Sequence, residues 1–159
     1  MNIESILSPS RTRCELVANS KKRAIELAAE HITSSLPGVE IGEVYRGLIE
    51  REKLGTTAIG EGVAIPHCRL GHCKSIIGGL FSLESAIDFG AHDDQPVSLM
   101  FILIVPEDER SQHLKALAML AARFENKDYR QSLINSKSDI ELYQRALLDP
   151  VGAVTKNPS

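Results

Sequence analysis

Two stretches in the first third of the chain carry apolar residues at the three-to-four-residue spacing of a helix. The first should span Ser20–Ser35, because serine is a favourable N-cap and a Pro-Gly pair follows the stretch. The second should span Ile41–Lys53 and stop at Gly55. The pattern therefore predicts two helices, followed by an extended segment.

The middle of the chain alternates glycine-punctuated segments with branched apolar runs, which is typical of strands. Val63–Ile65 is too short for a helix, and it predicts a strand that delivers His67 to its end. Ser75–Leu83 and Val97–Val105 predict two longer strands. The second of these runs is almost entirely branched or aromatic, so it should be a central strand that is covered on both faces.

The last third of the chain returns to helical spacing. One helix should begin with Ser111 as its N-cap, and two shorter helices are expected at about Lys127–Ile134 and Ser138–Leu148. Residues 150–159 have little apolar surface to bury and should form a flexible tail. Opening helices, several strands and closing helices together predict a single α/β domain with a mixed sheet.

Composition and charge exclude several classes of function. The 159 residues carry 18 Lys and Arg against 21 Asp and Glu, a balance that argues against nucleic acid as the main partner. The basic clusters at Arg11/Arg13 and Lys21-Lys22-Arg23 lack interleaved aromatics, so they are interpreted as solvated surface. The longest apolar run has seven residues, against the roughly 20 of a membrane span. Three cysteines and no signal-peptide pattern predict a cytoplasmic protein with reduced thiols.

Three side chains are candidates for chemistry. His67 follows Pro66, which stiffens the backbone and could present the imidazole as a nucleophile. His113 should lie in the first turn of its helix, where free N–H groups attract anions. Arg51 carries a fork of donors that fits phosphate oxygens. Each also has a simpler explanation: a structural histidine at a strand end, an exposed polar residue in a helical turn, and a surface arginine paired with a nearby glutamate.

A competing cluster consists of His67, Cys68, His72 and Cys73. These are ligand types for zinc or copper, but the CxxC spacing is absent and no distant Cys/His group completes a structural site. A metal site is therefore the less favoured interpretation. Neither a Walker A loop nor a GxGxxG motif occurs, which argues against ATP-dependent chemistry.

The order of these motifs resembles a known family. The segments that carry the resemblance are Arg51–Thr57, Gly60–His67, Asp94–Val97 running into Phe101–Pro106, and His113-Leu114. They are similar to the EIIA domain of the mannitol/fructose type in the sugar phosphotransferase system (EIIA type 2), and most similar to its nitrogen-regulatory members. The resemblance spans roughly residues 3–148, which is nearly the whole chain.

The resemblance implies a phosphohistidine carrier without cofactor or metal. It places a mannitol-type EIIA fold, a mixed sheet with helices on both faces, over residues 1–149. It also implies roles for three residues: His67 is the phosphorylated histidine, His113 the second active-site histidine and Arg51 the phosphate-neutralising arginine. The chain departs from the family at Cys68, where glycine is usual. A side chain there could crowd the approach of a donor or expose a thiol to oxidation.

The implied donor is a small histidine-phosphorylated carrier protein (HPr- or NPr-like), and the implied regulatory targets include potassium-transport and sensor-kinase proteins. Neither nucleic acid nor a membrane span is expected. One alternative is a standalone EIIA component of fructose- or mannitol-type sugar uptake, which passes the phosphate to a IIB partner. A second alternative, from another class, is a non-catalytic binding module with structural histidines.

Overall fold

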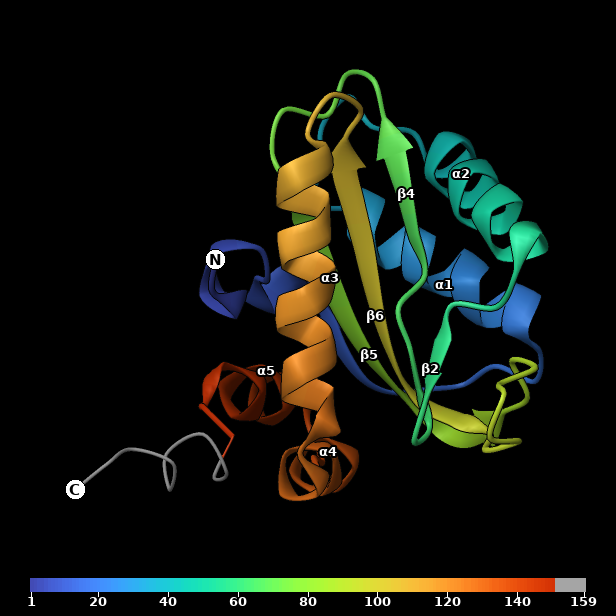
Figure 1. Cartoon of the computed structure of the whole chain (residues 1–159), viewed down its shortest axis with the longest axis vertical. Coiled ribbons are helices and arrows are strands. Elements are labelled where there is room, and N and C mark those ends of the chain that lie inside the picture. The colour runs from blue at the N-terminus through green and yellow to red at the C-terminus, as the bar shows by residue number, and fades with distance from the viewer. Residues whose placement is uncertain (151–159) are drawn as a thin grey trace.

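A computed structural model describes residues 1–150 of the chain (Figure 1). The flexible tail predicted for residues 150–159 lies outside the described residues, apart from Pro150. The helices are α1 (Lys21–Thr33), α2 (Ile41–Leu54), α3 (Arg110–Glu125), α4 (Lys127–Ile134) and α5 (Asp139–Leu147), preceded by two 3-10 turns at Ile3–Ser5 and Pro9–Arg11. The strands are β1 (Thr12–Leu16), β2 (Ala58–Gly60), β3 (Val63–Ala64), β4 (His67–Leu70), β5 (Ile77–Ile87) and β6 (Val97–Pro106).

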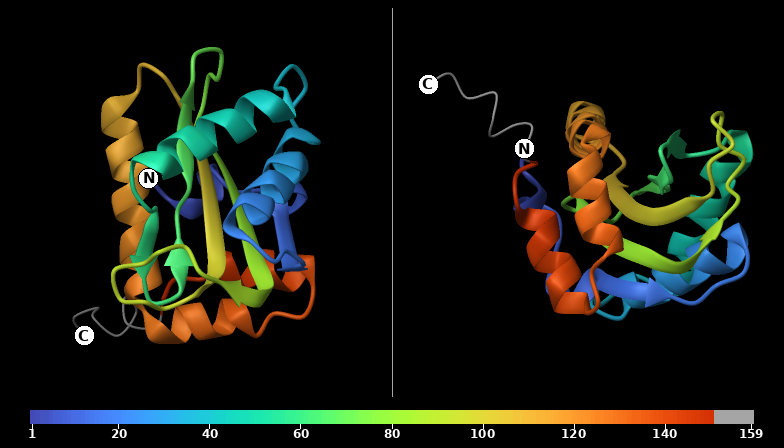
Figure 2. Two further views of the ribbon diagram at one scale, coloured as in Figure 1. Left: turned by 90° about the vertical axis from the view of Figure 1, so that its right-hand side faces the viewer. Right: turned by 90° about the horizontal axis from the view of Figure 1, so that it is seen from below.

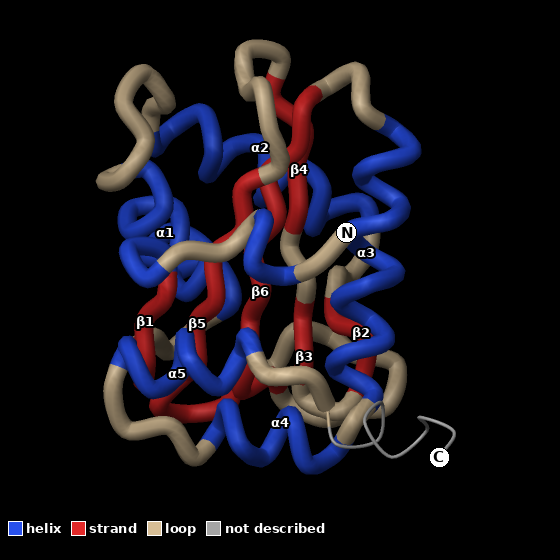
Figure 3. The backbone as a smooth tube through the Cα atoms, turned by 90° about the vertical axis from the view of Figure 1, so that its left-hand side faces the viewer, coloured by secondary structure: helices blue, strands red, loops and turns tan. Residues whose placement is uncertain are grey.

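The strands form one mixed sheet of six strands in the order β1-β5-β6-β3-β2, with β4 also paired to β6 (Figure 3). β1 runs parallel to β5, and both β3 and β4 run parallel to β6. The β5–β6 and β2–β3 pairs are antiparallel. The predicted mixed sheet in a single α/β domain is therefore confirmed.

The central strand β6 divides the core into two layers. Its residues Met100, Ile102 and Ile104 pack on the side of α1 and α2. The alternate side chains, such as Phe101 and Leu103, pack on the side of α3, α4 and α5. Figure 2 shows helices on both faces of the curved sheet. This confirms the prediction of a central strand covered on both faces, because a sheet buried on both sides needs apolar residues at consecutive positions.

β3 and β4 follow one another along the same edge of β6. Ala64 lies opposite Met100 and His67 lies opposite Leu103. Both strands therefore keep the same register with β6, although residues 65 and 66 interrupt the pairing. Pro66, which has no N–H to donate, lies within the interruption and accepts a hydrogen bond from the Leu103 N–H at 2.9 Å. The predicted strand end at His67 is therefore wrong in one respect: His67 begins β4 rather than following the last strand residue.

Two other predictions need correction. Ser111 is not the N-cap of α3; the turn that starts at Pro106 begins the helix earlier and places Glu109 there. Arg11 and Arg13 are not freely solvated. Arg11 donates to the carbonyl oxygens of Gly78 and Ile6 at 2.9 and 3.2 Å, because β1 brings this segment against β5. Arg13 lies in β1 itself.

Candidate active site

An open cleft of about 600 Å³ lies where β4 passes between α2 and α3. All three candidate side chains line it, although they come from three separate elements: Arg51 from the last turn of α2, His67 from the start of β4, and His113 from the first turns of α3. The remaining lining residues are Gly47, Glu50, Leu54, Cys68 and Arg69. The fold therefore brings together residues that are 62 positions apart in the sequence.

His67 is held in one orientation by the backbone. Its Nδ1 lies 2.8 Å from the carbonyl oxygen of Ile65. A carbonyl oxygen can only accept a hydrogen bond, so Nδ1 carries the proton and Nε2 of the neutral ring keeps its lone pair. The alternation of β4 places Cys68 in the core beside α2 and turns His67 to the opposite face, which is the face of α3.

His113 lies against the ring of His67. The two ring centroids are 5.1 Å apart and the ring planes meet at 67°, an edge-to-face arrangement. His113 is only 7% exposed, which contradicts the simpler explanation of an exposed polar residue. Its Nε2 is buried and has no hydrogen-bond partner within residues 1–150. A buried polar atom without a partner is uncommon and costs stability, so it makes His113 a candidate for a functional role.

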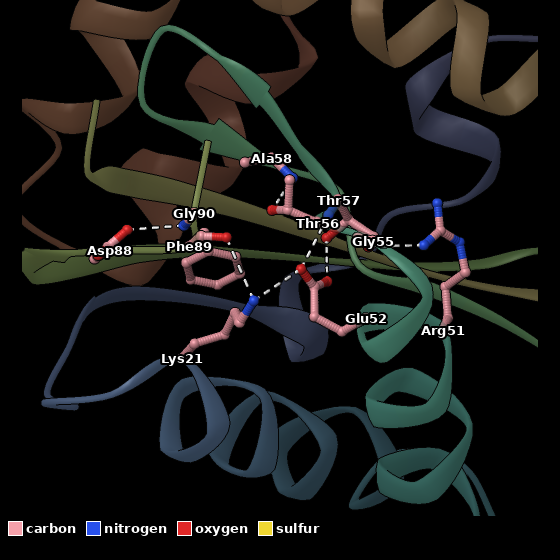
Figure 4. Close-up of polar contacts among 10 residues, drawn as sticks. All are labelled: Lys21, Arg51, Glu52, Gly55, Thr56, Thr57, Ala58, Asp88, Phe89 and Gly90. Carbon is pink, nitrogen blue, oxygen red and sulfur yellow. Dashed lines mark hydrogen bonds and ion pairs between the residues drawn. The ribbon is translucent and has the colours of Figure 1, made fainter. Parts of the chain in front are cut away.

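Arg51 does not pair with a neighbouring glutamate. Its guanidinium donates to the carbonyl oxygen of Gly55 at 2.9 Å, in the turn that ends α2 (Figure 4). A second guanidinium, that of Arg69, also lines the cleft. Arg69 lies two residues after His67 on β4 and therefore on the same face of the sheet. The sequence analysis did not single it out, although this spacing of two along a strand was a usable signal.

The electrostatics of the cleft favour neutral imidazoles. Burial lowers the pKa of His67 below its ordinary value, and the Arg51 and Arg69 guanidiniums lower it further. The hydrogen bond to Ile65 and the Glu52 carboxylate oppose this shift. Burial also lowers the pKa of His113, as do His67 and both guanidiniums. Two neutral rings beside two guanidinium cations form a site that suits a tetrahedral anion bearing two negative charges.

The expectation that Cys68 exposes its thiol is contradicted, although the residue does line the cleft. The residue is 7% exposed, and its Sγ would lie 3.1 Å from a Cβ added at Gly47 of α2. Burial raises the pKa of the Cys68 thiol to about 12, so the reactive thiolate is suppressed. Among residues 1–150, no three His, Cys, Asp or Glu side chains are grouped so that they could hold a metal ion.

Residues 5–147 match a family described as phosphoenolpyruvate-dependent sugar phosphotransferase system, EIIA 2. The chain belongs to this family. It is 39% identical over 144 residues to the nitrogen regulatory protein of Pseudomonas aeruginosa, an alignment that covers 91% of this chain and 94% of the relative. The resemblance described from the motifs is thereby confirmed.

Solved structures of EIIA proteins agree with the fold. The nitrogen regulatory protein IIA-Ntr of Neisseria meningitidis superposes with a TM-score of 0.81 at 37% identity, over 91% of this chain and 98% of that one. The IIA mannitol protein of Escherichia coli superposes with a TM-score of 0.72 at 21% identity, over 88% of this chain and 98% of that one. The predicted mannitol-type EIIA fold is confirmed. A family of this kind works with phosphocarrier partners, and none of the helices within residues 1–150 has the length and apolarity of a bilayer crossing.

Proposed function

We propose that the chain accepts a phosphoryl group on Nε2 of His67 from a histidine-phosphorylated, HPr- or NPr-like carrier protein. The observation that carries this proposal is the hydrogen bond from Nδ1 of His67 to the Ile65 carbonyl oxygen. It leaves Nε2 as the nucleophilic nitrogen of a ring that cannot rotate freely. In a group-transfer reaction, such positioning supplies much of the rate.

The transfer exchanges one N–P bond for another. Nε2 of His67 attacks the phosphorus in line, while the bond to the donor's imidazole breaks and its electron pair returns to that ring, whose other nitrogen holds a proton. Nδ1 of His67 keeps its own proton throughout, so no base is required. Three equatorial oxygens carry the charge in the transition state, and in this proposal Arg51 and an N–H of His113 stabilise them.

We further propose that the phosphorylation state of His67 controls regulatory partners in a nitrogen-related phosphotransferase system in the cytoplasm. The support is the similarity to proteins named nitrogen regulatory protein, at 39% identity over most of the chain. A phosphohistidine brings about two negative charges to the cleft, which is enough to change the electrostatic fit of a partner surface. Potassium-transport and sensor-kinase proteins are the expected targets.

Reconstitution tests the chemistry. Incubation with phosphoenolpyruvate, enzyme I and the carrier protein should label the chain, and mass spectrometry at alkaline pH should locate the acid-labile phosphate on His67. His67→Ala should take up no label. His72→Ala is the matched control, because His72 is half exposed and pairs with Glu43 away from the cleft lining. Full labelling of His67→Ala would overturn the assignment and favour a non-catalytic binding module.

A deletion strain tests the regulatory role. We expect sugar uptake to continue unchanged while potassium transport or sensor-kinase signalling responds to the deletion. Loss of uptake of one sugar would instead assign the chain to sugar transport with a IIB partner.

A further inference from the structure

A buried carboxylate sits directly behind the cleft. Glu52 follows Arg51 in the last turn of α2, but its side chain points into the protein and is only 4% exposed. Lys21, at the start of α1, donates to Oε2 of Glu52 at 3.2 Å and to the carbonyl oxygen of Phe89 at 3.3 Å (Figure 4). Lys21 is therefore not part of a solvated basic cluster, and the ion pair joins α1 to α2.

The second partner of Glu52 is Thr57, in the segment that leads into β2. The Thr57 backbone N–H donates to Oε2 at 3.0 Å, and the Thr57 hydroxyl donates to Oε1. The carboxylate thus accepts three hydrogen bonds and satisfies the requirement that a buried charge be both paired and hydrogen-bonded. The Glu52 carboxylate thus holds the end of α2, the start of α1 and the segment before β2 in fixed relative positions.

The hydrogen bonds continue from Thr57 to the nucleophile. The Ile65 N–H donates to the Thr57 carbonyl oxygen at 3.0 Å. The Ile65 carbonyl oxygen in turn accepts the Nδ1 proton of His67 at 2.8 Å. The backbones of Thr57 and Ile65 therefore connect the Glu52 carboxylate with the imidazole, and these hydrogen bonds fix the position of the carbonyl oxygen to which His67 donates.

We infer that Glu52 is a positioning residue for phosphoryl transfer, acting on His67 through the hydrogen bonds of Thr57 and Ile65. The inference rests on the proposed function of His67. It extends that function because Glu52 is not itself one of the residues that line the cleft. The same carboxylate anchors the turn in which Arg51 donates to the Gly55 carbonyl oxygen. It therefore helps to fix the position of Arg51 relative to His67.

Electrostatics add a second effect to the geometric one. The charged and titratable groups that face His67 are Arg51 and Glu52 of α2, Arg69 of β4 and His113 of α3. Among them, Glu52 alone raises the pKa of His67. A buried negative charge also favours the tautomer that places the proton on Nδ1, at the end of the hydrogen-bond chain.

Glu52→Gln tests the inference, because it removes the charge and keeps the shape. We expect the maximal rate of phosphorylation to fall about 10²-fold, the cost of a misplaced reacting group, with the KM for the phosphorylated carrier within about twofold of the wild-type value. In ¹⁵N NMR spectra of the unmodified protein, the His67 ring should populate more of the Nε2–H tautomer. Its pKa should also move further down. A purely structural role for Glu52 would lower stability but leave the tautomer ratio and the phosphorylation rate of the folded protein unchanged.

Two further variants complete the experiment. Glu40→Gln removes the same charge at the exposed N-cap of α2 and should leave rate, tautomer and pKa unchanged. Thr57→Val removes one hydroxyl contact, keeps the backbone hydrogen bonds of residue 57 to Glu52 and Ile65, and should shift the tautomer in the same direction by a smaller amount. It keeps the test open if Glu52→Gln fails to fold. A folded Glu52→Gln protein with wild-type rate and His67 spectrum would overturn the inference. Because the spectra need no phosphorylation, a failure of the proposed function is seen separately, as an unlabelled wild-type protein.

Discussion

Burial of His113 in the cleft should lower the free energy of unfolding of the protein. Its buried Nε2 has no partner within residues 1–150, and such an atom costs about 1–3 kcal/mol. Leucine has a similar volume, no polar atom, and a helix propensity better by a few tenths of a kcal/mol. We therefore predict that His113→Leu raises the free energy of unfolding by about 1–2 kcal/mol. The same change should slow phosphorylation of His67 by about 10²–10³-fold, as for the loss of one donor to the transition state.

Urea unfolding at pH 8 measures the stability, with both cleft histidines neutral. Far-UV circular dichroism is the suitable probe because the chain contains no tryptophan. A gain of 1 kcal/mol corresponds to about 2–4 °C in Tm for a chain of this size. His72→Leu is the matched control, since 47% of that side chain is exposed. A His113→Leu protein that is less stable than wild type and phosphorylated at the normal rate would refute the reasoning.

Three other changes have defined outcomes. Arg51→Ala should fold normally and slow phosphorylation by about 10²–10³-fold; transfer at the wild-type rate would remove this arginine from the mechanism. The transfer rate should stay constant from pH 8 down to the ordinary histidine pKa of about 6.5 and fall only below it, because burial lowers the pKa of His67 and the neutral ring is the nucleophile. A decline that begins above pH 7 would contradict this assignment. Gly47→Ala should be better tolerated beside Cys68→Gly than beside Cys68 by about 1 kcal/mol, because the new Cβ would lie 3.1 Å from the sulfur; additive unfolding energies would argue against this contact.

The longer elements were predictable from the sequence because one pattern dominates each of them. The apolar run at Val97–Val105 could only be a strand covered on both faces, and Lys127–Ile134 is observed with the predicted bounds. Ser20 caps α1 as predicted and accepts a backbone N–H. Ser138, predicted as the first residue of the last helix, is observed as the N-cap of α5. In these segments local propensity and tertiary burial favour the same structure.

The short strands could not be predicted in the same way. β1 and β4 each carry charged residues among the apolar ones, and their extended form depends on pairing with β5 and β6, which lie far along the chain. The same limit applied to the cleft. The motifs marked the three candidate residues, and the spacing of two along a strand could have added Arg69. The contacts of Glu52 depend on which elements meet at the end of α2, and local spacing carries no such information.

The resting contact of Arg51 has a consequence for the reversibility of the transfer. This guanidinium donates a hydrogen bond to a neutral peptide oxygen at the end of its own helix. If Arg51 stabilises the phosphoryl group as proposed, binding that group would replace one hydrogen bond to a neutral acceptor, and its release would restore this hydrogen bond. A phosphoryl carrier needs this balance, because an arginine that bound the phosphoryl group too strongly would slow its transfer to the next protein. The phosphorylated and unphosphorylated forms would then lie close in free energy. The direction of transfer would depend on the concentrations of the phosphorylated donor and the unphosphorylated acceptor.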